Sequence, residues 1–151
     1  MTDSLRPARL PAPLRRSIAA WLVAVACGVT ETLVRLALPD PPTAGELVGR
    51  SVVYALVVAS VLGLASGRAT VRVAVAVLLG AVGTVSLIAD PVGWLAAGGS
   101  PAAFLAAADG PTLLIVGLRT VHLLAVLIAL VAMFHPRANA FFRACRSPIA
   151  G

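Results

Sequence analysis

The sequence predicts an all-α membrane protein, a bundle of four transmembrane helices with a short interfacial helix in the second outer loop. Four apolar stretches, at residues 17–38, 47–66, 71–89 and 112–134, are each close to the roughly 20 residues that a helix needs to cross a ~30 Å hydrocarbon core. The composition agrees, since 60% of the residues are hydrophobic and only 12% are charged, against about 25% charged residues in soluble domains. The third observation is the placement of arginine.

Arginine is distributed unequally between the two sides that four spans create. One side has nine arginines and a single acid, Asp3, whereas the other side has three arginines and five acids. The formal charges of the two sides are therefore +8 and −2, which agrees with the net charge of +6. Because basic loops remain in the cytoplasm, we expect an N-in/C-in topology, with both termini on the arginine-rich side.

The first apolar stretch is interpreted as a retained span and not as a cleaved signal peptide. It is longer than the usual apolar region of about 7–15 residues, contains Glu31 and Arg35, and lacks a clear small-x-small cleavage site. We expect residues 1–14, with their prolines, to be a disordered basic cytoplasmic segment. Residues 15–135 then form the membrane domain, and residues 136–151 form a cytoplasmic tail.

Proline and glycine predict the first two connections. Pro39, Pro41 and Pro42 cannot continue a helix and should close the first span in an outer turn. Gly67 is suited to a left-handed helix C-cap in a tight turn. The second and third spans should therefore form an antiparallel hairpin.

The second outer loop contains the signals of one more helix. Ser100 followed by Pro101 predicts an N-cap and the first position of a helix near residues 101–108, which we expect at the outer interface beside Trp94. Asp109, Gly110 and Pro111 are interpreted as the end of that helix.

The tail after Pro136 mixes aromatic and basic side chains. Phe141 and Phe142 lie among Arg137, Arg143 and Arg146, a composition typical of the headgroup layer, where rings lie at the boundary and arginines meet anionic lipid. We therefore expect anionic lipid at the inner face as a partner.

Small residues predict close helix packing in lipid. Such residues recur at every fourth position and so lie on one face of each helix. They are Ala24 and Gly28 in the first span, the positions from Ala55 to Gly67 in the second, and Gly80 in the third. These stripes favour a tight core, and Gly63 with Gly67 could equally mark a face between two copies or another membrane protein.

The candidate site is a polar cluster in the outer half of the membrane. Its residues are Glu31, Arg35, Arg50, Tyr54, Arg119 and His122. Glu31 and Arg35 are one turn apart, in the favourable order for an ion pair, and Glu46 and Arg50 repeat this spacing. Arg119 lies about 10 Å deep at 1.5 Å per residue, which matches the depth of Glu31, so we expect these two side chains to pair across helices.

The cluster supports two interpretations. In the first, an internal ion-pair network fixes the order of the helices, with Arg35 and Arg50 reaching toward the interface. In the second, an outward-facing pocket binds a small solute and Glu31 or His122 exchanges protons.

Other functions are disfavoured by their missing signals. No Cys/His group has zinc-ligand spacing, no Gly-x-Ser-x-Gly elbow is present, and His122 and His135 lie on one span and so cannot ligate a haem from both faces. The scattered arginines form no basic face for nucleic acid. We therefore expect no enzyme activity, metal or cofactor. Four-helix multidrug exporters also use a membrane glutamate, but the motif that surrounds it there is not found here.

Three segments resemble a group of small uncharacterised actinobacterial membrane proteins with four helices. They are residues 21–32 (WLVAVACGVTET), residues 78–91 (LLGAVGTVSLIADP) and residues 134–143 (FHPRANAFFR). The likeness covers most of the chain, although the turn near residues 68–72 lacks the aromatic common in such proteins. The resemblance implies four helices in an actinobacterial envelope and implies no activity or catalytic residue.

Together these observations predict a multi-pass protein of the inner (plasma) membrane. The favoured function is a non-enzymatic envelope protein that binds lipid or protein partners, with homo-oligomers included among those partners. The alternative is a small-solute transporter, or a transporter subunit, that uses the polar cluster.

Overall fold

The computed structural model describes residues 10–145, and within this range all regular structure is helical. The elements follow in the order α1 (Ala12–Leu36), α2 (Ala44–Gly63), η1 (Leu64–Ser66), α3 (Ala69–Val75), η2 (Ala76–Val82), α4 (Gly83–Ala96), α5 (Pro101–Ala107), α6 (Gly110–Met133) and α7 (Pro136–Ala144). The segment η1 is a 3₁₀ turn and η2 is a π-helix.

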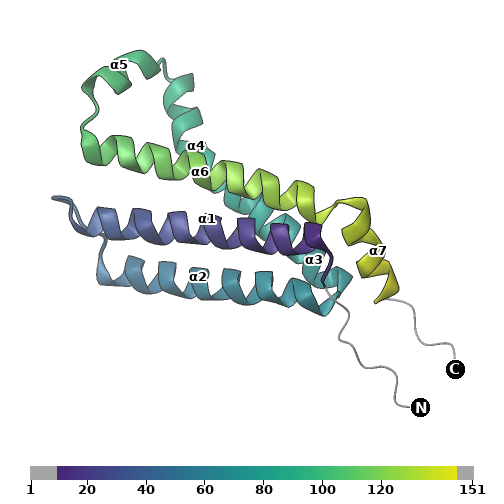
Figure 1. Cartoon of the computed structure of the whole chain (residues 1–151). Helices are drawn as coiled ribbons and strands as arrows, with labels where there is room; N and C mark the ends of the chain where they lie inside the picture. The colour runs from purple at the N-terminus through teal and green to yellow at the C-terminus, as the bar shows by residue number, and fades with distance from the viewer. Residues whose placement is uncertain (1–9, 146–151) are drawn as a thin grey trace, which may run out of the picture.

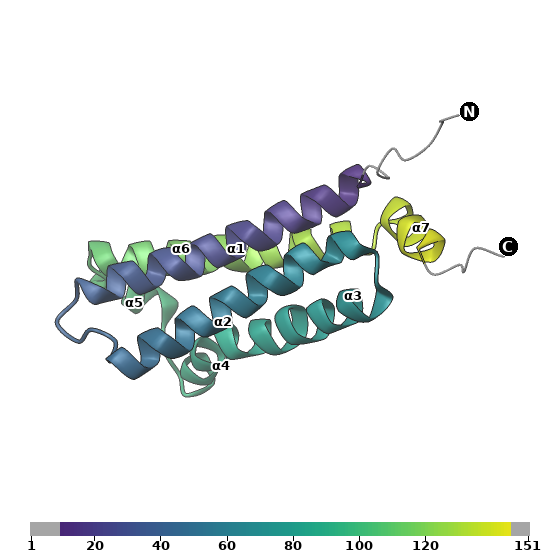
Figure 2. The same cartoon turned by 90° about the horizontal axis from the view of Figure 1, so that it is seen from below.

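Four continuous helices in the described residues are long and apolar enough to cross a membrane. They are Ala12–Leu36, Ala44–Ser66, Ala69–Ala96, which joins α3, η2 and α4, and Gly110–Met133. They run along a common direction, with α5 at one end of the bundle and α7 at the other (Figures 1 and 2). We call these the α5 end and the α7 end. The described residues thus contain the four long apolar helices that the sequence predicts.

The pair α1 and α6 has the most extensive helix contact, and α2 packs on α1. Ser17 donates a hydrogen bond of 2.8 Å to the carbonyl oxygen of Ala129 across the α1–α6 contact. Small side chains allow this approach, since Ala24, Ala125 and Ala129 are all buried there. The small-residue stripe predicted for the first span therefore does pack in the core.

The small-residue stripe predicted for the second span mostly does not pack in the core. Ala55 and Ala59 are exposed on the outside of α2, and only its end is in contact. A Cβ on Gly63 would lie 3.4 Å from Val71, and Gly67, at φ +70°, has the predicted left-handed conformation beside Cys145. This glycine pair thus packs inside the chain, where it closes the α2–α3 hairpin.

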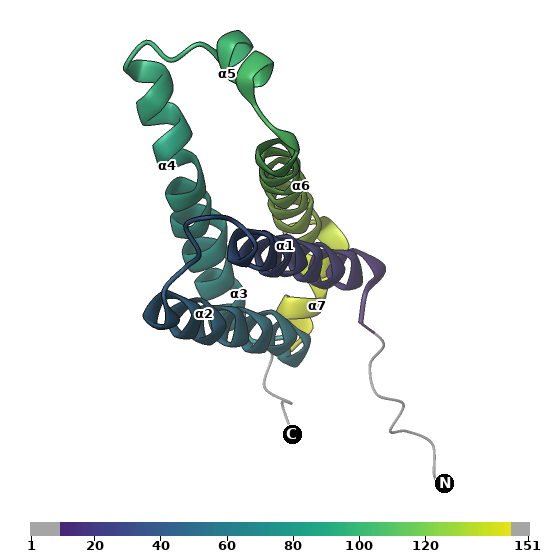
Figure 3. The same ribbon diagram turned by 90° about the vertical axis from the view of Figure 1, so that its left-hand side faces the viewer.

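The apolar core lies in the half of the bundle nearest α7. Its members come from α1, α2, η1, α3, α6 and α7 and include Leu14, Trp21, Leu64, Val126, Met133 and Phe142. Toward the α5 end, α4 separates from α6 and α5 spans the space between them (Figure 3). Polar side chains and cavities occupy that looser half.

Three predicted boundaries were wrong, and each of them lies near a proline. The first helix begins at Ala12 and buries Pro13 and Leu14, because proline is compatible with a first helical turn. The part of the predicted disordered segment at residues 1–9 lies outside the described residues. Pro91 lies inside the third long helix, which continues past the predicted end at residue 89 to Ala96.

The third wrong boundary is at Asp109, Gly110 and Pro111, which begin α6 and do not end α5. Asp109 is the N-cap and accepts a 3.0 Å hydrogen bond from the backbone N–H of Thr112, with proline again in the first turn. Hydrogen bonds from the Thr112 side chain and backbone hold the pKa of the Asp109 carboxyl below its ordinary value.

A further correction concerns the tail. Residues 136–144 form the helix α7, in which Phe142 is only 3% exposed and packs into the core while Phe141 is half-buried. The prediction that both rings lie in the headgroup layer was wrong for Phe142, because the open α7 end of the bundle offers that ring an apolar site.

Candidate functional site

The predicted contact between Glu31 and Arg119 is present and joins α1 to α6. The Nη2 of Arg119 lies 3.0 Å from Oε1 of Glu31, and its Nε lies 3.3 Å from Oε1 and 3.4 Å from Oε2. The predicted Glu31–Arg35 pair is also present, with Nε of Arg35 3.0 Å from the same Oε1. One carboxylate, 8% exposed, therefore serves two guanidinium groups.

A second polar contact joins α1 to α2 beside this carboxylate. The hydroxyl groups of Thr32 and Tyr54 lie 3.0 Å apart and share a hydrogen bond. The Tyr54 ring fits against α1 because residue 28 is glycine, where an added Cβ would lie 3.1 Å from the ring. Glu31 and Thr32 thus attach α1 to its two neighbours in the half of the bundle that lacks an apolar core.

The predicted Glu46–Arg50 pair is not formed. The Glu46 carboxylate instead accepts a 2.8 Å hydrogen bond from the backbone N–H of Thr43 in a capping box at the start of α2. The amides of a helix N-terminus are the nearer partners for an acid in the first turn. Arg50 consequently forms no ion pair within the described residues.

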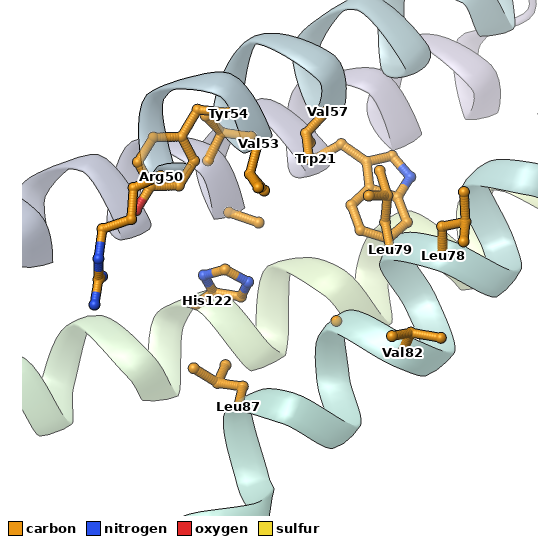
Figure 4. Close-up of a pocket in the computed structure, with 13 residues that line it drawn as sticks. Trp21, Arg50, Val53, Tyr54, Val57, Leu78, Leu79, Val82, Leu87 and His122 are labelled. Atoms are coloured by element: carbon orange, nitrogen blue, oxygen red, sulfur yellow. The ribbon is translucent and has the colours of Figure 1, made fainter. Parts of the chain in front are cut away.

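Arg50 and His122 border a large cavity, here called the α2–α4 cavity, which has a volume of about 540 Å³. It is lined by Trp21, Ala24, Val25, Arg50, Val53, Tyr54, Val57, Leu78, Leu79, Val82, Gly83, Leu87 and His122. Figure 4 shows Arg50 and His122 near one end and Trp21 near the other, with apolar side chains between them. The cavity is therefore polar at one end and apolar along its length.

The cavity wall includes two features that sequence reasoning missed. Leu78, Leu79 and Val82 come from the π-helix η2, a rare conformation that occurs mainly at functional sites. Trp21 is 2% exposed, and its indole Nε1–H has no acceptor among the described residues. An apolar sequence such as that of η2 gives no signal by which a π-helix could be recognised.

Arg119 lies on the wall of a second cavity of about 480 Å³, here called the α4–α6 cavity. Its lining also includes Asp90, Trp94 and Phe104, and the two rings meet edge to face at 5.9 Å. Five of the six predicted site residues thus lie in contacts or cavity walls of the α5 half, and Arg35 joins them through Glu31.

The described residues contain no group of three or more His, Cys, Asp or Glu side chains that could hold a metal ion. Cys27 and Cys145 are free thiols. The chain matches no protein-family model, no curated protein and no solved structure.

Proposed function

We propose that this chain is a non-enzymatic, multi-pass membrane protein that binds an anionic amphiphile in the α2–α4 cavity. The apolar chain of the ligand would lie along Trp21 and the η2 side chains, and its anionic head would meet Arg50 and His122. The observation that carries the proposal is an arginine without a carboxylate partner at the polar end of an apolar cavity.

The charges favour an anion over a cation. Glu31 is held between Arg35 and Arg119, and Glu46 is engaged by the backbone of its own helix. At the α2–α4 cavity, whose lining contains no carboxylate, the charged side chain that forms no ion pair within the described residues is therefore a base, Arg50. An unpaired arginine costs ~2.5–3.5 kcal/mol at the centre of a membrane span and less toward its ends, and an anionic head would offset part of that cost for Arg50.

The size and position of the cavity favour a molecule from the bilayer. Its volume lies within the ~300–1,000 Å³ of typical ligand pockets. The helix α2 packs on α3 near their connecting turn, but it makes no extensive contact with η2 or α4. A chain could thus enter between these helices without crossing the tightly packed α7 half.

We further propose that the protein lies in the plasma membrane, with the α7 end inside and the α5 end outside. The arginine-rich side of the charge pattern supports this orientation.

Trp21 allows a direct test of binding. Trp94 is the other of the two tryptophans in the sequence, so Trp94→Phe leaves Trp21 as the single fluorophore. A brominated fatty acid should quench Trp21 fluorescence saturably in the purified protein, because the bromine atoms would lie against the indole. Arg50→Gln in this background should weaken the apparent affinity about tenfold, the equivalent of one charge-assisted hydrogen bond.

The matched control is Arg68→Gln, which removes an exposed arginine at the α7 end, away from this cavity. It should leave the quenching curve unchanged. If quenching increased without saturation and were equal in both variants, the probe would only be partitioning into the micelle and the proposal would be wrong.

The alternative function is transport of a small solute, supported by the position of the Glu31–Arg119 pair. Arg119 lines the α4–α6 cavity, whereas His122, one turn along α6, lines the α2–α4 cavity. A charge pair between two cavities could gate movement from one to the other. Proton-dependent flux in reconstituted vesicles that is abolished by Glu31→Gln would favour this alternative over simple binding.

A further inference from the structure

A third site lies at the opposite end of the bundle, between the start of α3 and the helix α7. It is a pocket of about 230 Å³, here called the α7 pocket, lined by Ala69, Arg72, Asn139, Phe142 and Arg143. It shares no lining residue with the α2–α4 cavity. The α7 pocket is therefore a separate site from the α2–α4 cavity.

Arg72 is held in a defined position in this pocket. Its guanidinium carbon lies 4.2 Å from the ring centre of Phe134 and 4.9 Å from that of Phe142. Its Nη2 donates a hydrogen bond to Oδ1 of Asn139, and the amide nitrogen of Asn139 donates to the carbonyl oxygen of Phe134 at 3.0 Å. The rings and the amide fix the orientation of the guanidinium before any ligand arrives.

The same guanidinium lacks an anion. Arg72 forms no ion pair among the described residues, and its buried Nε has no hydrogen-bond partner there. The side chain of Arg143, on the wall of the same pocket, has no ion pair or hydrogen bond within residues 10–145. Every acid in the described range lies on the connections or helix halves at the α5 end, namely Glu31, Asp40, Glu46, Asp90 and Asp109.

We infer that the α7 pocket is a phosphate-binding site formed by Arg72 and Arg143. A planar guanidinium with free N–H groups matches the oxygens of a phosphate, and two arginines can neutralise one phosphodiester or monoester. The pocket is smaller than the ~300 Å³ lower limit of common ligand pockets, so it accepts a head group and leaves any acyl chain outside. The phosphate can come from an anionic phospholipid or from solution.

The experiment measures binding to the purified full-length chain in a neutral detergent. Phosphatidylglycerol, phosphatidylcholine and inorganic phosphate are titrated separately, with lipid retention followed by native mass spectrometry and the thermal unfolding midpoint followed in parallel. A ligand that binds the folded state raises that midpoint. We expect saturable binding of phosphatidylglycerol with little binding of phosphatidylcholine, or saturable binding of inorganic phosphate.

Three variants locate the binding. Arg143→Gln should weaken it about tenfold or more, since one charge-assisted contact is lost. Asn139→Asp should weaken it similarly, because the new carboxylate supplies Arg72 with an internal counter-charge while α7 stays docked. Arg137→Gln, which removes an exposed arginine of α7 outside the pocket, should leave binding unchanged.

The titrations distinguish the two sources of phosphate. Saturation by phosphatidylglycerol alone identifies a lipid head group, whereas saturation by inorganic phosphate identifies a soluble ligand. Absence of binding by both, or equal losses in Arg143→Gln and Arg137→Gln, would overturn the inference. Retained helicity and an unchanged midpoint without ligand show that each variant remains folded.

Discussion

At the scale of single residues, Glu31 is the group on which most polar contacts of the α5 half depend. Its carboxylate pairs with Arg35 on its own helix and with Arg119 on α6. Depth matching was enough to predict the interhelical pair, because two charges at one level in lipid have few other partners. The spacing of one turn, which correctly predicted the Glu31–Arg35 pair, failed for Glu46 and Arg50, because the Glu46 carboxylate is engaged by the backbone N–H of Thr43 at the start of α2.

Because two arginines share the one carboxylate of Glu31, mutations of Glu31 and of Arg119 should have unequal effects on stability. Glu31→Leu should lower the free energy of unfolding by ~3–5 kcal/mol, the usual loss when one partner of a buried pair is removed. Arg119→Leu should cost less, about 1–3 kcal/mol, because Arg35 still neutralises the carboxylate. Denaturant titration in detergent micelles measures both values.

The Glu31→Leu/Arg119→Leu double variant should recover much of the loss, since only Arg35 then lacks a partner and it can reach the interface. Strictly additive losses in the double variant would show that the two side chains are not energetically coupled.

At the scale of helices, the contact of α1 with α2 depends on glycine 28 and the tyrosine ring beside it. Gly28→Val should push the Tyr54 ring away, break its hydrogen bond to Thr32 and lower the free energy of unfolding by about 1–3 kcal/mol, as overpacked cores do.

Gly49→Val is the matched control on α2, because no atom lies within 4 Å of a Cβ added there. It should leave stability nearly unchanged under the same denaturant titration. Equal effects of the two substitutions would mean that α1 and α2 do not meet as described.

Helix ends were the least predictable feature at this scale. Proline does not by itself mark a helix end in this protein, since it lies in the first turns of α1, α5, α6 and α7, and Pro91 lies inside α4. The sequence pattern marks where proline occurs but not on which side of it the helix lies. The hydrogen bonds of the N-cap residues decide on which side of a proline the helix lies. Asp109, for example, accepts a hydrogen bond from the backbone N–H of Thr112 and so begins α6.

At the scale of the whole molecule, four long helices bring the described ends of the chain, near Leu10 and Cys145, to the same end of the bundle (Figure 1). Combined with the charges of +8 and −2, this arrangement predicts a cytoplasmic α7 end.

Reporter fusions test the orientation. Fusions at Gly67 and Gly151 should report the cytoplasm, and fusions near Gly45 and Gly99 should report the outside, because basic segments resist translocation. An external signal at Gly151 would contradict the four-span topology.

The sequence by itself determined the helical class, the four spans, the hairpin at Gly67 and the Glu31–Arg119 pair. These features follow from local hydropathy, glycine conformation and the cost of charge in lipid, which depend little on the exact packing. The tertiary structure alone decided that Arg50 forms no ion pair within the described residues, that α7 folds back over Arg72, and that the apolar core occupies only the α7 half. Each of these depends on which helix faces are in contact, and in a chain so rich in alanine and valine many faces are equally apolar.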